Sequence, residues 1–198
     1  MEKYTEVRWH GRAQQGIVTA AKLLGETALT EGKYVQAFPE FGPERMGAPV
    51  RSYNRLSDKP IRVHCSVTSP DVVIIVDITL IAVLEADPAL PSTTSGTDGD
   101  AVFLVNTNHS AERLRGELGV ADSVKVYTLD ASQISLDTIG RQMPNTPMLG
   151  ALAKATDLVK IDGLIENFRE NYSKKYDEKV IAGNIEAMKR GYAEVKGE

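Results

Sequence analysis

The 198-residue sequence contains very little cysteine and histidine. Because Cys65 is the only cysteine, the chain cannot form an internal disulfide. It also cannot supply by itself the four thiolates that an iron–sulfur cluster ordinarily requires. His10, His64 and His109 are the only histidines, and they lack the spacing of zinc ligands. Any redox metal that this protein serves must therefore be held by another chain.

The sequence also lacks a positive charge excess and a long apolar run. Its formal net charge is −4, and no run rich in Lys or Arg is present, which argues against a nucleic-acid partner. The longest strongly apolar run, residues 72–76, is far too short to cross a membrane. Residues 1–6 lack the apolar core of a signal peptide. We therefore expect a cytoplasmic protein that binds neither membranes nor nucleic acid.

Alternating strand-like and helix-like segments predict an α/β fold in a single domain, residues 1–198. The strand-like segments are residues 4–9, 34–38, 50–56, 61–67, 70–77, 101–106 and 123–129. The helix-like segments are residues 16–29, 80–84, 111–118, 131–139, 148–155, 161–172 and 176–195. Residues 70–77 are apolar on both faces, as in a central parallel strand. Residues 50–56 and 61–67, joined by a short turn, predict an inserted β-hairpin.

Cys65 lies in the alternating segment 61–67, so we expect it to be a packed structural thiol rather than a nucleophile. No Ser–His–Asp, Cys–His or spaced carboxylate pair indicates self-contained catalysis elsewhere. The chain is therefore not expected to be catalytic alone.

The loop at residues 9–16 separates the first strand from the first helix and contains Gly11 and Gly16. Such a turn exposes backbone N–H groups beside a helix N-terminus and is a natural anion site. It does not match the dinucleotide fingerprint, because positions 13 and 14 are Ala and Gln, and the acidic residue expected at the end of the second strand is only marginally matched by Glu40. Two interpretations remain: a tight turn without a ligand, or contact of Arg12, Gln14 and Gln15 with a phosphate or a neighbouring chain.

The second unusual loop, residues 38–49, holds three Pro, two Gly, two Glu and one Arg. Its adjacent Glu44 and Arg45 are either a solvated surface pair of little energetic value or a docking contact that loses little entropy on binding. Asp77 follows the central strand, where it either caps the next helix or binds loop amides. Asn145 and Thr146 lie in a predicted rigid turn before a helix that Pro147 begins. They either present polar groups to a ligand or only form that turn.

These same residues carry a family resemblance. Trp9-His10-Gly11-Arg12-Ala13 with Gln15-Gly16, and residues 19–24, 36–51, 70–77, 145–152 and 189–192, are similar to the gamma subunit of the pyruvate:ferredoxin oxidoreductases. These enzymes are thiamine-dependent 2-oxoacid oxidoreductases, and the resemblance covers essentially the whole chain. One departure is Gln14, where the family usually has Gly. A side chain at this position adds bulk and disfavours a positive φ.

The resemblance implies one subunit of a larger enzyme that oxidatively decarboxylates a 2-oxoacid to acyl-CoA and CO2 while reducing ferredoxin. Pyruvate is the 2-oxoacid that the resemblance favours. It implies thiamine pyrophosphate and Mg between the alpha and beta subunits and 4Fe–4S clusters in the beta and delta subunits. The gamma subunit would bind none of these by itself. It would be a Rossmann-related, mostly parallel sheet with helices on both faces, the inserted hairpin and a helical C-terminus.

The resemblance also implies a site and partners. The expected partners are the alpha, beta and delta subunits, with ferredoxin reached through the complex. The residues expected to face the alpha–beta core or the coenzyme A route are Gly11, Arg12, Gln15, Gly16, Glu44, Arg45, Asn145 and Thr146. Alternative oxoacids are phenylglyoxylate, 2-oxoglutarate and branched-chain or aryl-pyruvates. An alternative of another class is a free-standing nucleotide-binding or scaffold protein.

Overall fold

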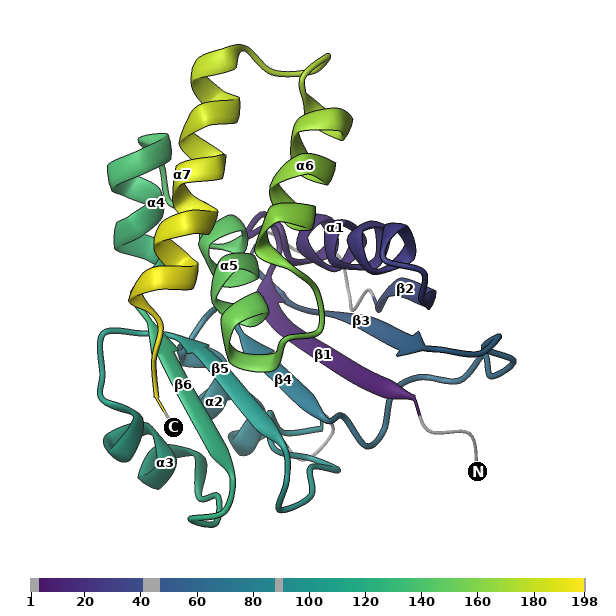
Figure 1. The fold of residues 1–198 in the computed structure, drawn as a ribbon. Coiled ribbons are helices and arrows are strands. Elements are labelled where there is room, and N and C mark those ends of the chain that lie inside the picture. Colours follow the sequence, from purple (N-terminus) through teal and green to yellow (C-terminus); the bar gives the residue numbers. More distant parts are fainter. Residues whose placement is uncertain (1–3, 41–46, 88–90, 198) are drawn as a thin grey trace.

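The structure is a computed structural model that describes residues 4–40, 47–87 and 91–197. Its strands form one sheet in the order β2-β3-β1-β4-β5-β6-β7 (Figure 1). The strands are β1 (Thr5–Arg12), β2 (Tyr34–Glu40), β3 (Pro49–Ser57), β4 (Val72–Ile75), β5 (Val102–Asn106), β6 (Lys125–Leu129) and β7 (Lys196–Gly197). The adjacent strands β1, β4, β5 and β6 are parallel, which confirms the predicted parallel centre.

Helices cover both faces of the sheet, as predicted. They are α1 (Ile17–Thr30), α2 (Thr79–Ala86), α3 (Ala111–Leu118), α4 (Ala131–Ile139), α5 (Asn145–Thr156), α6 (Ile161–Tyr172) and α7 (Glu178–Glu194). In Figure 1, α1 and α4 to α7 lie on one face, and α2 and α3 lie on the other. Each face has its own apolar core: Ile74 of β4 packs toward the first group, and its neighbours Val73 and Ile75 pack toward α3.

The antiparallel insertion uses different strands from those predicted. β3 pairs with both β2 and β1 in antiparallel fashion, whereas residues 61–67 form no strand. Backbone carbonyls of residues 61–67 accept hydrogen bonds from side chains of β2 and β3 rather than from the backbone of a neighbouring strand. The Gln36 amide donates to the Val63 carbonyl at 2.9 Å, and the Arg55 guanidinium donates to the Cys65 carbonyl at 3.2 Å. The prediction that Cys65 is packed is therefore wrong, because its side chain is exposed on this irregular segment.

β1 separates an apolar face from a polar one. Trp9 is fully buried on the side of α1, and its indole N–H donates to the Asn54 side chain at 2.9 Å. On the opposite side, Arg8 and His10 are also buried, and the Arg8 Nε donates to the His10 Nε2 at 2.9 Å. Burial lowers the pKa of His10 well below its ordinary value, and the positive charge of Arg8 and Arg51 acts in the same direction. His10 is therefore neutral near pH 7.

Candidate functional site

The loop between β1 and α1 has a strained backbone. Both Gln14 and Gly16 have positive φ, 78° and 76°. Gly11 lies within β1 rather than in the loop, because the strand continues to Arg12. A Cβ atom on Gly11 would approach Cγ2 of Ile17 to 2.6 Å, so glycine permits α1 to begin directly against the strand.

Asp77 is the centre of a hydrogen-bonded cluster at the carboxyl ends of β1 and β4. Its Oδ2 accepts from the Arg12 Nε at 3.1 Å and from the Gln15 side-chain amide at 2.9 Å. Its Oδ1 accepts from the Thr79 backbone N–H at 3.1 Å and from the Thr79 hydroxyl at 2.5 Å. The sequence left two roles open for Asp77, and the carboxylate performs both. It binds the Gln15 amide of the loop, and it accepts from the Thr79 N–H at the start of α2.

The charge of Asp77 is stabilised by these partners. Burial alone would raise the pKa of its carboxyl group, but the hydrogen bonds from Thr79 and Gln15 and the charge of Arg12 together hold the pKa below its ordinary value. The carboxylate is consequently ionised at neutral pH and compensates the Arg12 guanidinium.

Arg12 also joins this cluster to the second loop. Its guanidinium donates to the Gly47 carbonyl at 2.9 Å and to the Thr79 hydroxyl at 2.8 Å, and its backbone N–H donates to the Gln15 side chain at 2.7 Å. The Ala13 N–H donates to the Ala48 carbonyl at 3.1 Å. Arg12 and Gln15 thus hold three segments together, a role that the sequence alone did not reveal. Glu44 and Arg45 lie outside the described residues.

Gly16 brings the start of α1 against the start of α5. A Cβ atom on Gly16 would lie 2.7 Å from the Asn145 Nδ2, so the two residues are in direct contact. Asn145 is buried, and its Oδ1 has no hydrogen-bond partner among the described residues. No side chain caps α1, and its first turn contains no acidic residue, so the partial positive charge of that end is not neutralised there.

Thr146 has a packing partner. Its hydroxyl lies 2.9 Å from the Asn184 side chain of α7. The predicted turn at residues 144–147 is instead the first turn of α5, which begins at Asn145 rather than after Pro147. Proline is tolerated there because the first N–H groups of a helix have no partner within the helix.

The structure therefore brings Gly11, Arg12, Gln15, Gly16 and Asn145 together at one edge of the sheet, with Thr146 beside them facing α7. Within the described ranges, no group of three or more His, Cys, Asp or Glu side chains is placed to hold a metal ion. No described helix has both the length and the apolar character needed to cross a membrane. The arrangement is that of a rigid polar surface beside a helix N-terminus.

The comparison with protein families decides the identity of this α/β domain. Residues 6–194 match the model of the family described as pyruvate ferredoxin/flavodoxin oxidoreductase. The chain belongs to this family. The match covers the strands and helices just described from β1 to the end of α7, together with the loop cluster.

Individual relatives agree with this assignment. The chain is 44% identical over 195 residues to pyruvate synthase subunit PorC of Thermotoga maritima, covering 98% of this chain and 96% of that protein. It is 41% identical over 185 residues to the common gamma subunit of the pyruvate/ketoisovalerate oxidoreductases of Pyrococcus abyssi, covering 93% and 96%. The crystal structure of the Thermotoga maritima PORC subunit matches with a TM-score of 0.85 and 41% identity, over 100% of this chain and 99% of that one. These matches confirm the predicted family and the predicted gamma-subunit type.

Proposed function

We propose that this chain is the gamma subunit of a thiamine-dependent enzyme that oxidatively decarboxylates pyruvate to acyl-CoA and CO2 and reduces ferredoxin. The observation that carries the proposal is the near full-length similarity to pyruvate synthase subunit PorC. The chain itself contributes structure rather than chemistry. The alpha, beta and delta subunits are its partners, and ferredoxin reacts with the complex.

In this proposal the cofactors belong to the other subunits. Thiamine pyrophosphate would supply the carbanion chemistry, and 4Fe–4S clusters would carry the electrons. The residues of this chain do not fit a cluster, because its single cysteine, Cys65, offers one thiolate where a cluster ordinarily requires four. Arg12 instead joins the end of β1 to Asp77 and to the Gly47 carbonyl, and a surface that is already ordered loses little entropy when another subunit docks on it.

The loop cluster is also proposed to line the approach of coenzyme A. The start of α1 offers backbone N–H groups without a capping side chain, and helix N-termini of this kind attract phosphate. Coenzyme A carries phosphates, so this uncapped helix N-terminus is complementary to it.

The experiment that tests this role compares the reconstituted complex with wild-type chain and with Arg45→Ala. We expect weaker subunit association or a raised KM for coenzyme A, because the substitution removes the guanidinium of Arg45. Arg141→Ala, which alters an exposed arginine elsewhere, serves as the control and should change neither quantity. Wild-type association and wild-type KM in Arg45→Ala would contradict the proposed role of this loop.

A second candidate is a subunit shared between two enzymes. The similarity to the common gamma subunit of the pyruvate/ketoisovalerate oxidoreductases favours it. Assays of complexes that contain this chain against pyruvate and a branched-chain oxoacid distinguish the two. Two separable complexes with different oxoacid preferences would support sharing, and a single pyruvate-specific complex would support the first proposal.

A further inference from the structure

α2 exposes an unusually apolar face. Six of its eight residues are apolar, yet only Leu80 and Leu84 are buried. Ala82, Val83 and Ala86 are exposed, and Val83 has 42% of its surface accessible. Exposed apolar patches that are rimmed by polar residues are typical of interaction sites. We call this surface the α2 face.

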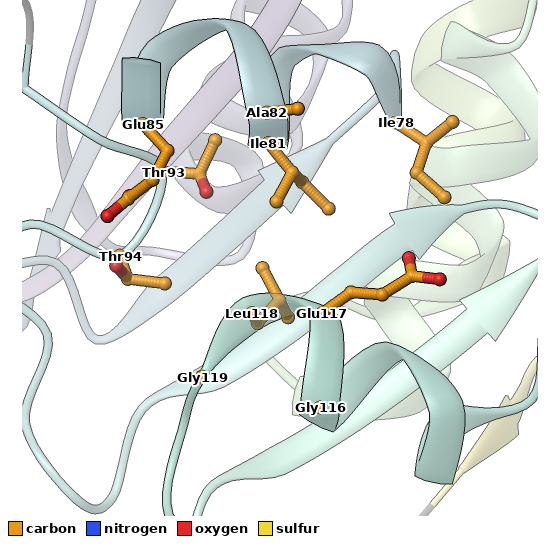
Figure 2. A pocket seen from close by; sticks show the side chains of 10 residues that line it. All are labelled: Ile78, Ile81, Ala82, Glu85, Thr93, Thr94, Gly116, Glu117, Leu118 and Gly119. Atoms are coloured by element: carbon orange, nitrogen blue, oxygen red, sulfur yellow. The ribbon is translucent and has the colours of Figure 1, made fainter. Parts of the chain in front are cut away.

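The α2 face borders a cleft of about 460 Å³ between α2 and α3. Figure 2 shows Ile81 and Leu118 in the middle of the cleft, on opposite walls, with Glu85 and the two threonines toward one end and Glu117 toward the other. The cleft is lined by Ile78, Ile81, Ala82, Glu85, Thr93, Thr94, Gly116, Glu117, Leu118 and Gly119. Its walls are therefore apolar in the middle and polar at both ends.

The charge in this cleft is unevenly compensated. Glu117 is paired with the Arg113 guanidinium at 2.8 Å. The Glu85 carboxylate forms no hydrogen bond or ion pair with any residue in the described part of the chain. The last residues of α3 and the following Gly119 line the same cleft, so the partial negative charge of the helix C-terminus lies at its wall. The Glu85 end thus carries a negative charge with no partner from the described residues.

An apolar channel that ends at a carboxylate is complementary to one kind of side chain. Lys and Arg bury an aliphatic stem along apolar surface while the cationic head reaches a charged or polar partner. Between Ile81 and Leu118 such a stem would be desolvated, and its head would lie near Glu85 and the hydroxyls of Thr93 and Thr94. An anionic or purely apolar group would leave Glu85 uncompensated.

We propose that the α2 face and the adjoining cleft form the docking surface for another subunit of the same oxidoreductase, which inserts a Lys or Arg side chain toward Glu85. The inference rests on the proposed function, because it requires a multisubunit enzyme. The surface is continuous with the loop cluster, since Thr79 at the start of α2 accepts a hydrogen bond from Arg12. Docking at α2 would therefore affect the position of Arg12 and of the loop between β1 and α1.

The test measures the association of purified, tagged chain with the remaining subunits of its enzyme. Val83→Asp and Glu85→Lys should each weaken association at least tenfold, because one places a charge on the apolar face and the other repels the cation. Leu136→Asp and Glu186→Lys make the same changes on α4 and α7, where Leu136 is 38% exposed, and should associate like wild type. Wild-type association of the first two variants would overturn the docking surface.

A photo-crosslinking amino acid at Ala82 identifies the occupant in the intact complex. We expect a crosslink to another subunit, at a segment that contains Lys or Arg. A crosslink to a second copy of this chain, or no crosslink in a complex that has assembled, would overturn the inference while leaving the proposed function intact. Failure of the wild-type chain to associate with any subunit would overturn the proposed function itself.

Discussion

The Nε atom of Arg12 lies 3.1 Å from Oδ2 of Asp77, and this ion pair joins the last residue of β1 to a residue two positions before the start of α2. Both side chains are largely shielded from solvent, with 26% and 16% of their surfaces exposed. Because the Arg12 guanidinium also donates to the Gly47 carbonyl, the pair fixes the position of Gly47 just before β3. The shape of the candidate interface therefore depends on a contact between residues far apart in the sequence.

Replacing Asp77 by Ala should lower the free energy of unfolding by about 2 kcal/mol, since charged hydrogen bonds are lost and Arg12 is left without its counter-charge. Asp58→Ala is the matched control, because its ion pair with Lys33 is 89% exposed on the carboxylate side. That substitution should change the free energy of unfolding by no more than about 0.5 kcal/mol. Urea denaturation measures both, and equal effects would contradict the structural role of Asp77.

The ionised Asp77 carboxylate should also make the free energy of unfolding depend on pH in the acid range. Because the folded-state pKa of Asp77 is lowered, its stabilising contribution is present above the pKa of the unfolded chain and is lost as the pH falls through the folded-state value. Asp77→Asn removes the titrating group, so the variant should lose less stability than wild type between about pH 5 and pH 2. If the free energies of unfolding of the two proteins fall in parallel with pH, the pKa of Asp77 is not lowered in the folded protein.

His10 should make stability pH-dependent in a different range. Its pKa is lowered by burial in the folded protein, so below about pH 6.5 the unfolded chain binds a proton that the folded chain does not. The free energy of unfolding should fall by up to about 1.4 kcal/mol per pH unit there, and level off above that range. His10→Gln should remove this slope, whereas His64→Gln, at an exposed position, should keep it. A slope retained in His10→Gln would contradict this assignment.

Gly16→Ala tests the contact between α1 and α5. The substitution places a side chain at a positive φ and a Cβ atom only 2.7 Å from the Asn145 side chain. We therefore expect the free energy of unfolding to fall by roughly 3 kcal/mol or more. Gly32→Ala is the control, because it also has a positive φ, 87°, but no atom within 4 Å of the added Cβ. It should cost only about 1 kcal/mol. If thermal unfolding shows the same loss of stability in both variants, the contact with Asn145 does not contribute to stability.

Gln14→Gly tests the departure from the family's usual glycine. Gln14 has a φ of 78°, which costs about 1–2 kcal/mol for a residue with a side chain, whereas glycine loses about 0.5–1 kcal/mol more backbone entropy on folding. The net result should be a gain of up to about 1 kcal/mol, visible as a raised Tm. A lowered Tm would show that the Gln14 side chain makes a stabilising contact that outweighs its backbone strain.

Local patterns predicted most elements of this fold. The helices at residues 111–118, 131–139 and 161–172 have the predicted bounds, and Asp130 caps α4 by accepting from the Gln133 N–H. Gly32, just after the end of α1, has a positive φ of 87° and donates its N–H to the Leu29 carbonyl. Signals of this kind are local, since periodicity and capping involve residues only a few positions apart.

Non-local pairing was not predictable from the same patterns. Residues 61–67 alternate like a strand, but β3 already has β1 and β2 as its neighbours. The buried Arg8 and His10 were missed for a related reason, although the alternation of Glu6, Arg8, His10 and Arg12 indicates a polar face. The sequence shows such a face, but the carbonyl of Thr93 that accepts from Arg8 lies 85 positions away.

The central claim is that this chain works as one subunit of a 2-oxoacid:ferredoxin oxidoreductase. The most direct measurement is to tag the chain in its native cells, purify it, and determine which chains and cofactors accompany it. We expect alpha, beta and delta subunits, bound thiamine pyrophosphate and iron–sulfur absorbance, with pyruvate-dependent reduction of ferredoxin. Recovery of the tagged chain alone, as a stable and monodisperse monomer, would contradict it.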